Sequence, residues 1–141
     1  MNVIGKKNIV LGFAYLVATL SLGFYMAYAM FASGERATWL NSAAHALIKT
    51  AHVHGNLESV VNIIGGLVIC LFGSRTPRLC KTASILLILG AVFHSGMFYL
   101  GGLGVPNVVR LGFFGPVLLI AGIVLLVPIS WKGITADRVA M

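Results

Sequence analysis

The segment TAHVHGNLESVVNIIGG, residues 50–66, places two histidines, two asparagines and one of the three acidic residues of the chain at the start of a long apolar run. Polar and ionisable side chains are costly in hydrocarbon unless they are paired, and those found inside a membrane often mark functional sites. If this run crosses a membrane, its polar cluster is therefore a functional-site hypothesis. The rest of the chain is then expected to pack around the cluster and to anchor it.

The composition indicates an integral membrane protein. The chain has 141 residues, of which 59% are hydrophobic and 9% charged, and its mean hydropathy is +0.99. These values exclude a soluble domain with one ordinary core. Each membrane crossing needs roughly 20 apolar residues, so four crossings use most of the chain and leave no room for a catalytic domain outside the membrane.

The apolar runs predict an all-α membrane protein, a four-transmembrane-helix bundle forming a single domain over residues 1–141. The runs are long and continuous and lack the alternating pattern of a membrane β-barrel. The apolar part of the first run is longer than the roughly 7–15 residues of a signal-peptide core, so this run is interpreted as a retained span. The expected spans are about 8–32, 43–73, 82–103 and 109–130.

The distribution of lysine and arginine predicts the orientation. With four spans, both termini and the turn at residues 74–81 share one side of the membrane, which carries seven basic residues, whereas the other side carries three. The positive-inside rule then places both termini in the cytoplasm of a multi-pass inner-membrane (plasma-membrane) protein. The net charge of +7 is explained by this topology and by contact with anionic lipid, and nucleic-acid binding is not expected. The basic residues on the side of the termini are Lys6, Lys7, Arg75, Arg78, Lys81, Lys132 and Arg138. Those on the opposite side are Arg36, Lys49 and Arg110.

Three histidines are expected at similar depth in the outer half of the membrane. His52 and His54 precede the turn near Thr76 by about as many residues as His94 follows it, and the helical rise per residue is constant. His54 and His94 can therefore face each other across two adjacent antiparallel helices.

Glu58 and Asn62 follow His54 at i+4 and i+8, which places a polar face on the second span toward the bundle. We expect Glu58 to relay protons, or else to accept a hydrogen bond from His54 or donate one to a backbone carbonyl. Asn62 would extend either arrangement.

Two imidazoles on neighbouring helices are what a b-type haem needs for axial ligation. Arg110, near the outer start of the fourth span, is placed to meet a haem propionate. Copper held by His52, His54, His94 and Met97 is the alternative cofactor, since imidazole and thioether suit copper. The structural alternative has His54 bonded to Glu58 or to a carbonyl, without any cofactor.

The motifs Thr50-Ala51-His52 and His54-Gly55-Asn56-Leu57 resemble the second transmembrane helix of haem–copper oxidase subunit I and of the nitric oxide reductase large subunit. In that superfamily a histidine near the outer start of this helix ligates the low-spin haem. The resemblance implies haem ligation by His52 if TAH is aligned, or by His54 if HxNL is aligned, and His54 is preferred because Glu58 shares its face. That superfamily has about twelve helices and further histidines for a second metal, so the reduction of oxygen or nitric oxide by this chain alone is not implied.

A second resemblance is to the four-helix membrane glutathione-transferase and eicosanoid family. It rests on His54-Gly55-Asn56-Leu57-Glu58 and on residues 106–115, which contain Arg110. Asn56 and Glu58 are two residues apart here, whereas the family spaces them three apart and precedes them with several arginines. This resemblance is therefore placed second.

Together these observations predict a small membrane protein that binds haem b in its outer half through His54 and His94. The expected role is electron transfer, or that of an accessory subunit in a respiratory or oxidative membrane complex. Its expected partners are the lipid bilayer and other membrane subunits, or further copies of the chain. Whether it is an enzyme is left open, and the competing classes are the glutathione-transferase type and a structural subunit without cofactor.

Overall fold

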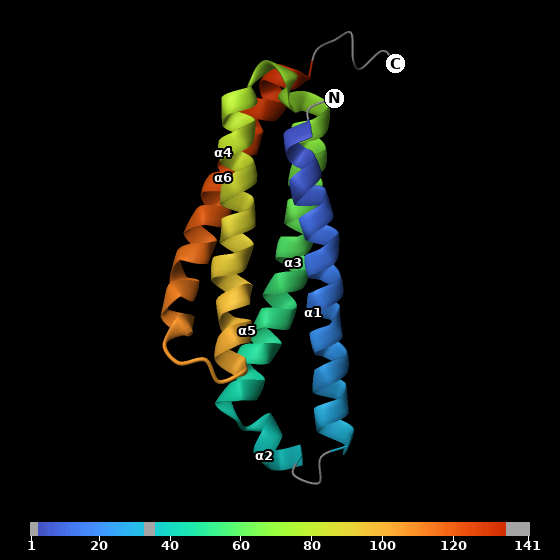
Figure 1. The fold of residues 1–141 in the computed structure, drawn as a ribbon, viewed down its shortest axis with the longest axis vertical. Coiled ribbons are helices and arrows are strands. Elements are labelled where there is room, and N and C mark those ends of the chain that lie inside the picture. Colours follow the sequence, from blue (N-terminus) through green and yellow to red (C-terminus); the bar gives the residue numbers. More distant parts are fainter. Residues whose placement is uncertain (1–2, 33–35, 135–141) are drawn as a thin grey trace.

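The computed structural model describes residues 3–32 and 36–134. These residues form an all-helical structure with four long helical segments (Figure 1). Four helical segments are long and apolar enough to cross a membrane: Val3–Phe31, Ala43–Arg75, Pro77–Gly102 and Val108–Gly133. The chain is thus a small multi-pass membrane protein, as its composition predicts. The first span begins before the predicted residue 8, and the last continues beyond the predicted residue 130.

Each span combines a long helix with short tighter or wider turns. The third span is the least regular, because a π-helical turn interrupts it. In chain order the elements are η1 (Val3–Gly5), α1 (Lys6–Ala32), α2 (Arg36–Leu40), α3 (Ala43–Phe72), η2 (Gly73–Arg75), α4 (Pro77–Ala91), the π-helical turn η3 (Val92–Gly96), α5 (Met97–Gly102), η4 (Val108–Phe113) and α6 (Phe114–Gly133).

Local sequence signals set the beginnings of the helices. Ser42 caps α3, because its Oγ accepts a hydrogen bond from the backbone N–H of His45 at 3.1 Å. Pro77 occupies the first turn of α4, where its missing N–H costs nothing. Between α5 and η4 the chain turns through Gly104 and Asn107, which both have positive φ.

The bundle consists of two closely packed helix pairs, α1 with α3 and α4 with α6 (Figure 1). Glycines allow the close approach that helix packing in membranes requires. A Cβ added to Gly66 would lie 2.6 Å from the Gly5 carbonyl oxygen, and one added to Gly90 would lie 2.9 Å from the Leu119 nitrogen.

A buried cluster of polar side chains joins the two pairs. Asn8 of α1 donates through Nδ2 to the Asn62 Oδ1 at 2.9 Å and to the Ser84 carbonyl at 3.1 Å. The Ser84 hydroxyl donates back to the Asn8 Oδ1 at 2.5 Å. Asn62 in turn donates to the carbonyls of Glu58 and Leu87, both at 3.1 Å. These bonds fix α1, α3 and α4 against one another.

Replacing Asn62 with leucine should lower the free energy of unfolding by about 1–2 kcal/mol, the upper range for interhelical hydrogen bonds in membranes, because both Asn8 and the Leu87 carbonyl lose a partner. The measurement is reversible unfolding in mixed micelles. The exposed Asn41→Leu change is the matched control and should have little effect. Equal effects of the two changes would contradict the role of the cluster.

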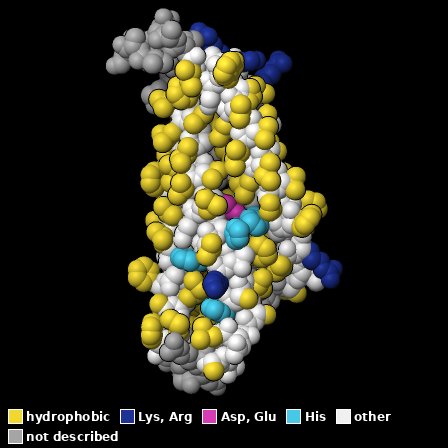
Figure 2. Space-filling model, turned by 180° about the vertical axis from the view of Figure 1, so that it is seen from behind, with side chains coloured by type: hydrophobic (Ala, Val, Ile, Leu, Met, Phe, Trp, Pro, Cys, Tyr) yellow, Lys and Arg dark blue, Asp and Glu magenta, His cyan; other side chains and the backbone are white. Residues whose placement is uncertain are grey.

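The end of the bundle that carries η1, η2 and the last turn of α6 is basic (Figures 1 and 2). Arg75 lies beside the end of α6, with its Nη1 3.5 Å from the Lys132 carbonyl oxygen. The predicted clustering of basic residues at one end is therefore present for the described residues, and Arg138 lies outside them. That this end faces the cytoplasm of an inner membrane stays a prediction.

Candidate metal centre

The π-helical turn η3 presents two consecutive polar residues, His94 and Ser95, to the buried side of α3. Such turns are rare, and they occur frequently at functional sites. Both residues contact the same side chain, Glu58 of α3.

Glu58 is 3% exposed, and both of its carboxylate oxygens have partners. The imidazole Nδ1 of His94 lies 2.5 Å from Oε1, and the Ser95 hydroxyl donates to Oε2. Tyr15 of α1 extends the network, with its hydroxyl 2.7 Å from the Ser95 Oγ. A buried carboxylate is tolerated only when it is hydrogen-bonded in this way, and here the bonds also fix its orientation.

His54 completes the cluster and lies on α3, one helical turn before Glu58. Its ring centroid lies 4.6 Å from that of His94, with the two planes tilted by 59°. One donor atom from each of His54, Glu58 and His94 lies within 4.8 Å of the others. Figure 2 shows acidic and histidine side chains side by side on one face of the bundle, among hydrophobic side chains.

A cavity of about 170 Å³ adjoins the three residues. Its remaining lining is apolar and comes largely from α6, including Pro116, Leu119 and Ile120. The cluster thus has free space on one side and a hydrogen-bonded support on the other.

Two imidazoles and one carboxylate could hold a metal ion. Metal–ligand bonds to nitrogen and oxygen are about 2.0–2.2 Å long, so ligand atoms on one ion are no more than roughly 4 Å apart, and small side-chain movements would close the present spacing. Imidazole suits zinc, copper, iron and nickel, and two histidines with one carboxylate are the ligand set of non-haem iron centres that keep open positions. Glu58 can act either as a ligand or, through the His94 Nδ1, as the carboxylate that orients a histidine ligand.

The other predicted site residues lie apart from this cluster. His52 faces α1, and its Nδ1 is 2.7 Å from the Thr19 carbonyl. Arg110 is exposed on η4 and is not among the residues that line the cavity. Asn62 belongs to the buried polar cluster with Asn8, although it also donates to the Glu58 carbonyl.

Ser95 and Tyr15 were not predicted from the sequence, although they hold the carboxylate in place. Ser95 follows His94 directly, and both lie in the π-helical turn, where each contacts a different oxygen of Glu58. Tyr15 lies within an apolar run, and no charged residue beside it in the sequence indicates that it faces a polar site.

Comparison with models of protein families, with curated proteins and with solved structures found no match for this chain. The resemblances to the oxidase and the glutathione-transferase families therefore stay predictions. What the cluster can do is argued below from its own geometry.

Proposed function

We propose that this chain is a membrane protein that binds one transition-metal ion within its bundle through His54, Glu58 and His94. The observation that carries the proposal is the convergence of the three donor groups, each within 4.8 Å of the others. They come from α3 and the π-helical turn, which are held together by the bonds of His94 and Ser95 to Glu58, and Tyr15 joins the turn to α1. Its role would be electron transfer, alone or as an accessory subunit of an oxidative complex in the inner membrane.

Haem b bound by His54 and His94 stays a second candidate. A porphyrin ligated by both histidines would have to lie between their rings, which are in contact with centroids 4.6 Å apart. The adjoining cavity of about 170 Å³ is also smaller than the roughly 300–1,000 Å³ of ordinary cofactor pockets. The described arrangement therefore favours a bare ion over a porphyrin.

The direct test is metal analysis of protein purified from its own membranes without a metal-affinity step, together with a reduced-minus-oxidised absorption spectrum. About one iron or copper per chain without b-type bands would support the proposal, whereas one zinc per chain would support the metal site but contradict electron transfer, because zinc has no redox chemistry. Iron with sharp b-type bands would support the haem candidate instead. A chain without metal that also fails to take up added iron, copper or zinc would overturn the proposal.

Replacing Ser95 with alanine should weaken metal binding by roughly 10–100-fold, the usual cost of removing a hydrogen bond that orients a metal ligand. Ser95 is not itself a proposed ligand, so the ion should still bind at high concentration. The measurement is a titration of metal-free protein with the identified ion. Ser21→Ala is the matched control, because the Ser21 hydroxyl donates to a carbonyl of its own helix, that of Val17, and makes no hydrogen bond to another helix among the described residues. Equal affinities of the two variants would contradict a supporting role for Ser95.

A further inference from the structure

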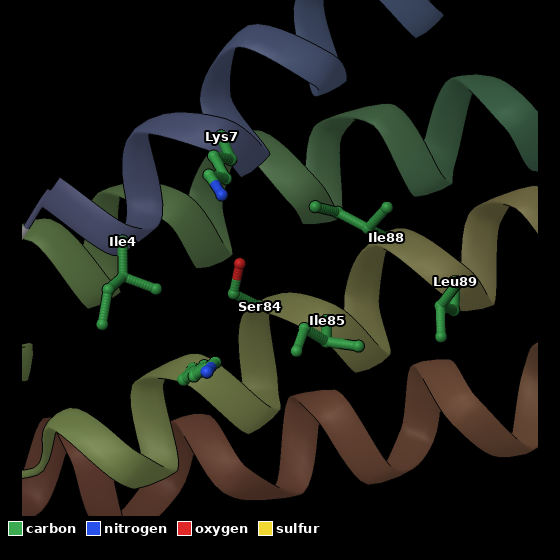
Figure 3. A pocket seen from close by; sticks show the side chains of 7 residues that line it. Ile4, Lys7, Ser84, Ile85, Ile88 and Leu89 are labelled. Carbon is green, nitrogen blue, oxygen red and sulfur yellow. The ribbon is translucent and has the colours of Figure 1, made fainter.

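A second cavity lies between α1 and α4, at the basic end of the bundle and away from the three candidate ligands. Its volume is about 440 Å³. Figure 3 shows Lys7 reaching from α1 into this space, with Ser84, Ile85, Ile88 and Leu89 along α4 beside it. The lining is completed by Ile4 and Lys81.

Two lysines from different helices line the same cavity. Lys7 and Lys81 are both exposed, and each lies near one partner of the Asn8–Ser84 hydrogen bonds: Lys7 precedes Asn8, and Lys81 lies one turn before Ser84. Because those bonds hold Asn8 and Ser84 at one level, the two lysines are also near one level. Two positive charges from two helices are thereby brought to one cavity near the end of the spans.

Below the lysines the wall is apolar and faces outward. Ile85 is 47% exposed and Leu89 is 38% exposed, and both belong to a segment long and apolar enough to cross a membrane. In a bilayer these side chains contact lipid chains. The cavity thus combines a cationic mouth near the membrane surface with an apolar groove that continues toward the membrane centre.

The cavity is also preformed. α1 packs mainly on α3 and α4 mainly on α6, so α1 and α4 touch each other little except through the Asn8–Ser84 bonds. The buried polar cluster fixes the separation of the two helices. Ligand binding therefore does not carry the entropic cost of ordering them.

We propose that this cavity binds one anionic phospholipid, with its phosphate between Lys7 and Lys81 and an acyl chain along Ile85, Ile88 and Leu89. Charge complementarity selects an anionic headgroup, and basic pockets between transmembrane helices are known to bind such headgroups. The apolar groove selects a lipid over a free phosphate. This site is independent of the candidate metal centre.

The test uses the purified full chain in bilayers of phosphatidylcholine that contain a small fraction of spin-labelled phosphatidylglycerol or spin-labelled phosphatidylcholine. The measured quantity is the ratio of the association constants of the two labelled lipids at the protein surface. The variants are Lys7→Gln and Lys81→Gln, alone and together. Lys6→Gln and Arg78→Gln are matched controls, since both positions are exposed at the same end but do not line the cavity.

The wild-type chain should prefer phosphatidylglycerol, and each cavity lysine should contribute about fivefold, the equivalent of about 1 kcal/mol per basic residue near the membrane surface. The double variant should lose the preference, and the two controls should keep most of it. No preference in the wild type, or an equal loss in controls and cavity variants, would overturn the proposal, because the attraction would then be absent or spread over the basic end.

Ile85→Trp tests the groove without changing charge. A tryptophan there should fill part of the cavity and reduce the preference, because the acyl chain would lose its place. Soluble glycerol phosphate, added in excess, should not displace the labelled lipid. Displacement by glycerol phosphate together with an unaffected Ile85→Trp variant would mean that the lysines bind phosphate alone, and the lipid proposal would be wrong.

Discussion

Replacing His94 with alanine is expected to lower the metal affinity of the chain by more than about 100-fold. Loss of a hydrogen bond that merely orients a ligand already costs roughly 10–100-fold, and His94 is both a proposed ligand and the partner of Glu58. The His54→Ala change should have a comparable effect, because His54 supplies the second imidazole. The measurement is metal content after purification, followed by titration of the metal-free protein.

The control for both changes is His52→Ala. It removes the same ring from the same helix as His54→Ala, at a position that contacts the Thr19 carbonyl instead of the cluster. This variant should keep its metal. If His52→Ala lost as much metal as His54→Ala, the proposed ligand set would be wrong.

Loss of the His94 ring also leaves a buried carboxylate with one partner fewer, and this could reduce stability. His94→Gln separates the two effects, because glutamine can donate a hydrogen bond to Glu58 but is a poor ligand for a transition metal. We expect the glutamine variant to unfold at nearly the wild-type denaturant concentration while still losing the ion. Retention of the ion by His94→Gln would contradict ligation by His94.

The second large effect is expected from Gly115→Ala at the start of α6. A Cβ at this position would lie 2.6 Å from the His94 Cα and closer still to the His94 backbone nitrogen. Backbone atoms cannot rotate away as a side chain can, so α6 and the π-helical turn must separate. The expected cost is about 1–3 kcal/mol in the free energy of unfolding, the usual range for overpacking.

Gly112→Ala is the control for this change. Gly112 is also buried and lies one turn earlier, but an added Cβ would meet its nearest neighbour, the Phe93 carbonyl oxygen, at an ordinary 3.6 Å. Unfolding in mixed micelles should therefore distinguish the two variants, and Gly115→Ala should also weaken metal binding because it displaces His94. Similar stabilities of the two variants would contradict the tight contact of α6 with the π-helical turn.

The fold could be predicted largely from composition, because uninterrupted apolar runs of this length have few alternatives to spanning helices. The second span begins at residue 43 as predicted, where Ser42 caps α3. The third span was expected from residue 82 but begins at Pro77, because the basic segment that was assigned to the turn forms the first turn of α4. The nearness of His54 and His94 followed from their similar chain distances to the turn near Thr76. In each case the prediction needed only the composition, the residues next to one helix end, or a distance counted along the chain.

The remainder of the site depends on which face each helix turns toward its neighbours. Composition, helix-end residues and distances along the chain do not determine that orientation. The expected shared face of Glu58 and Asn62 is divided in the structure, because Asn62 joins Asn8 and Leu87 whereas Glu58 joins His94. Helical spacing indicates which residues lie near each other along one helix, but the neighbouring helices determine which partner each residue meets. Tyr15 could not be found for the same reason.

The π-helical turn has a consequence for the length of the chain. Beyond it, Gly102 packs so closely on α3 that an added Cβ would lie 2.5 Å from the Ile48 side chain. A π-helical turn holds one residue more than the α-helical turn that it replaces, so its five residues rotate the chain by about as much as four residues of a regular helix. Deleting one residue from Val92–Gly96 should therefore give a regular helix and leave Gly102 against α3, whereas the same deletion within α4 would rotate everything after it by about 100°. This stretch should thus tolerate the loss of one residue better than the regular part of the same span.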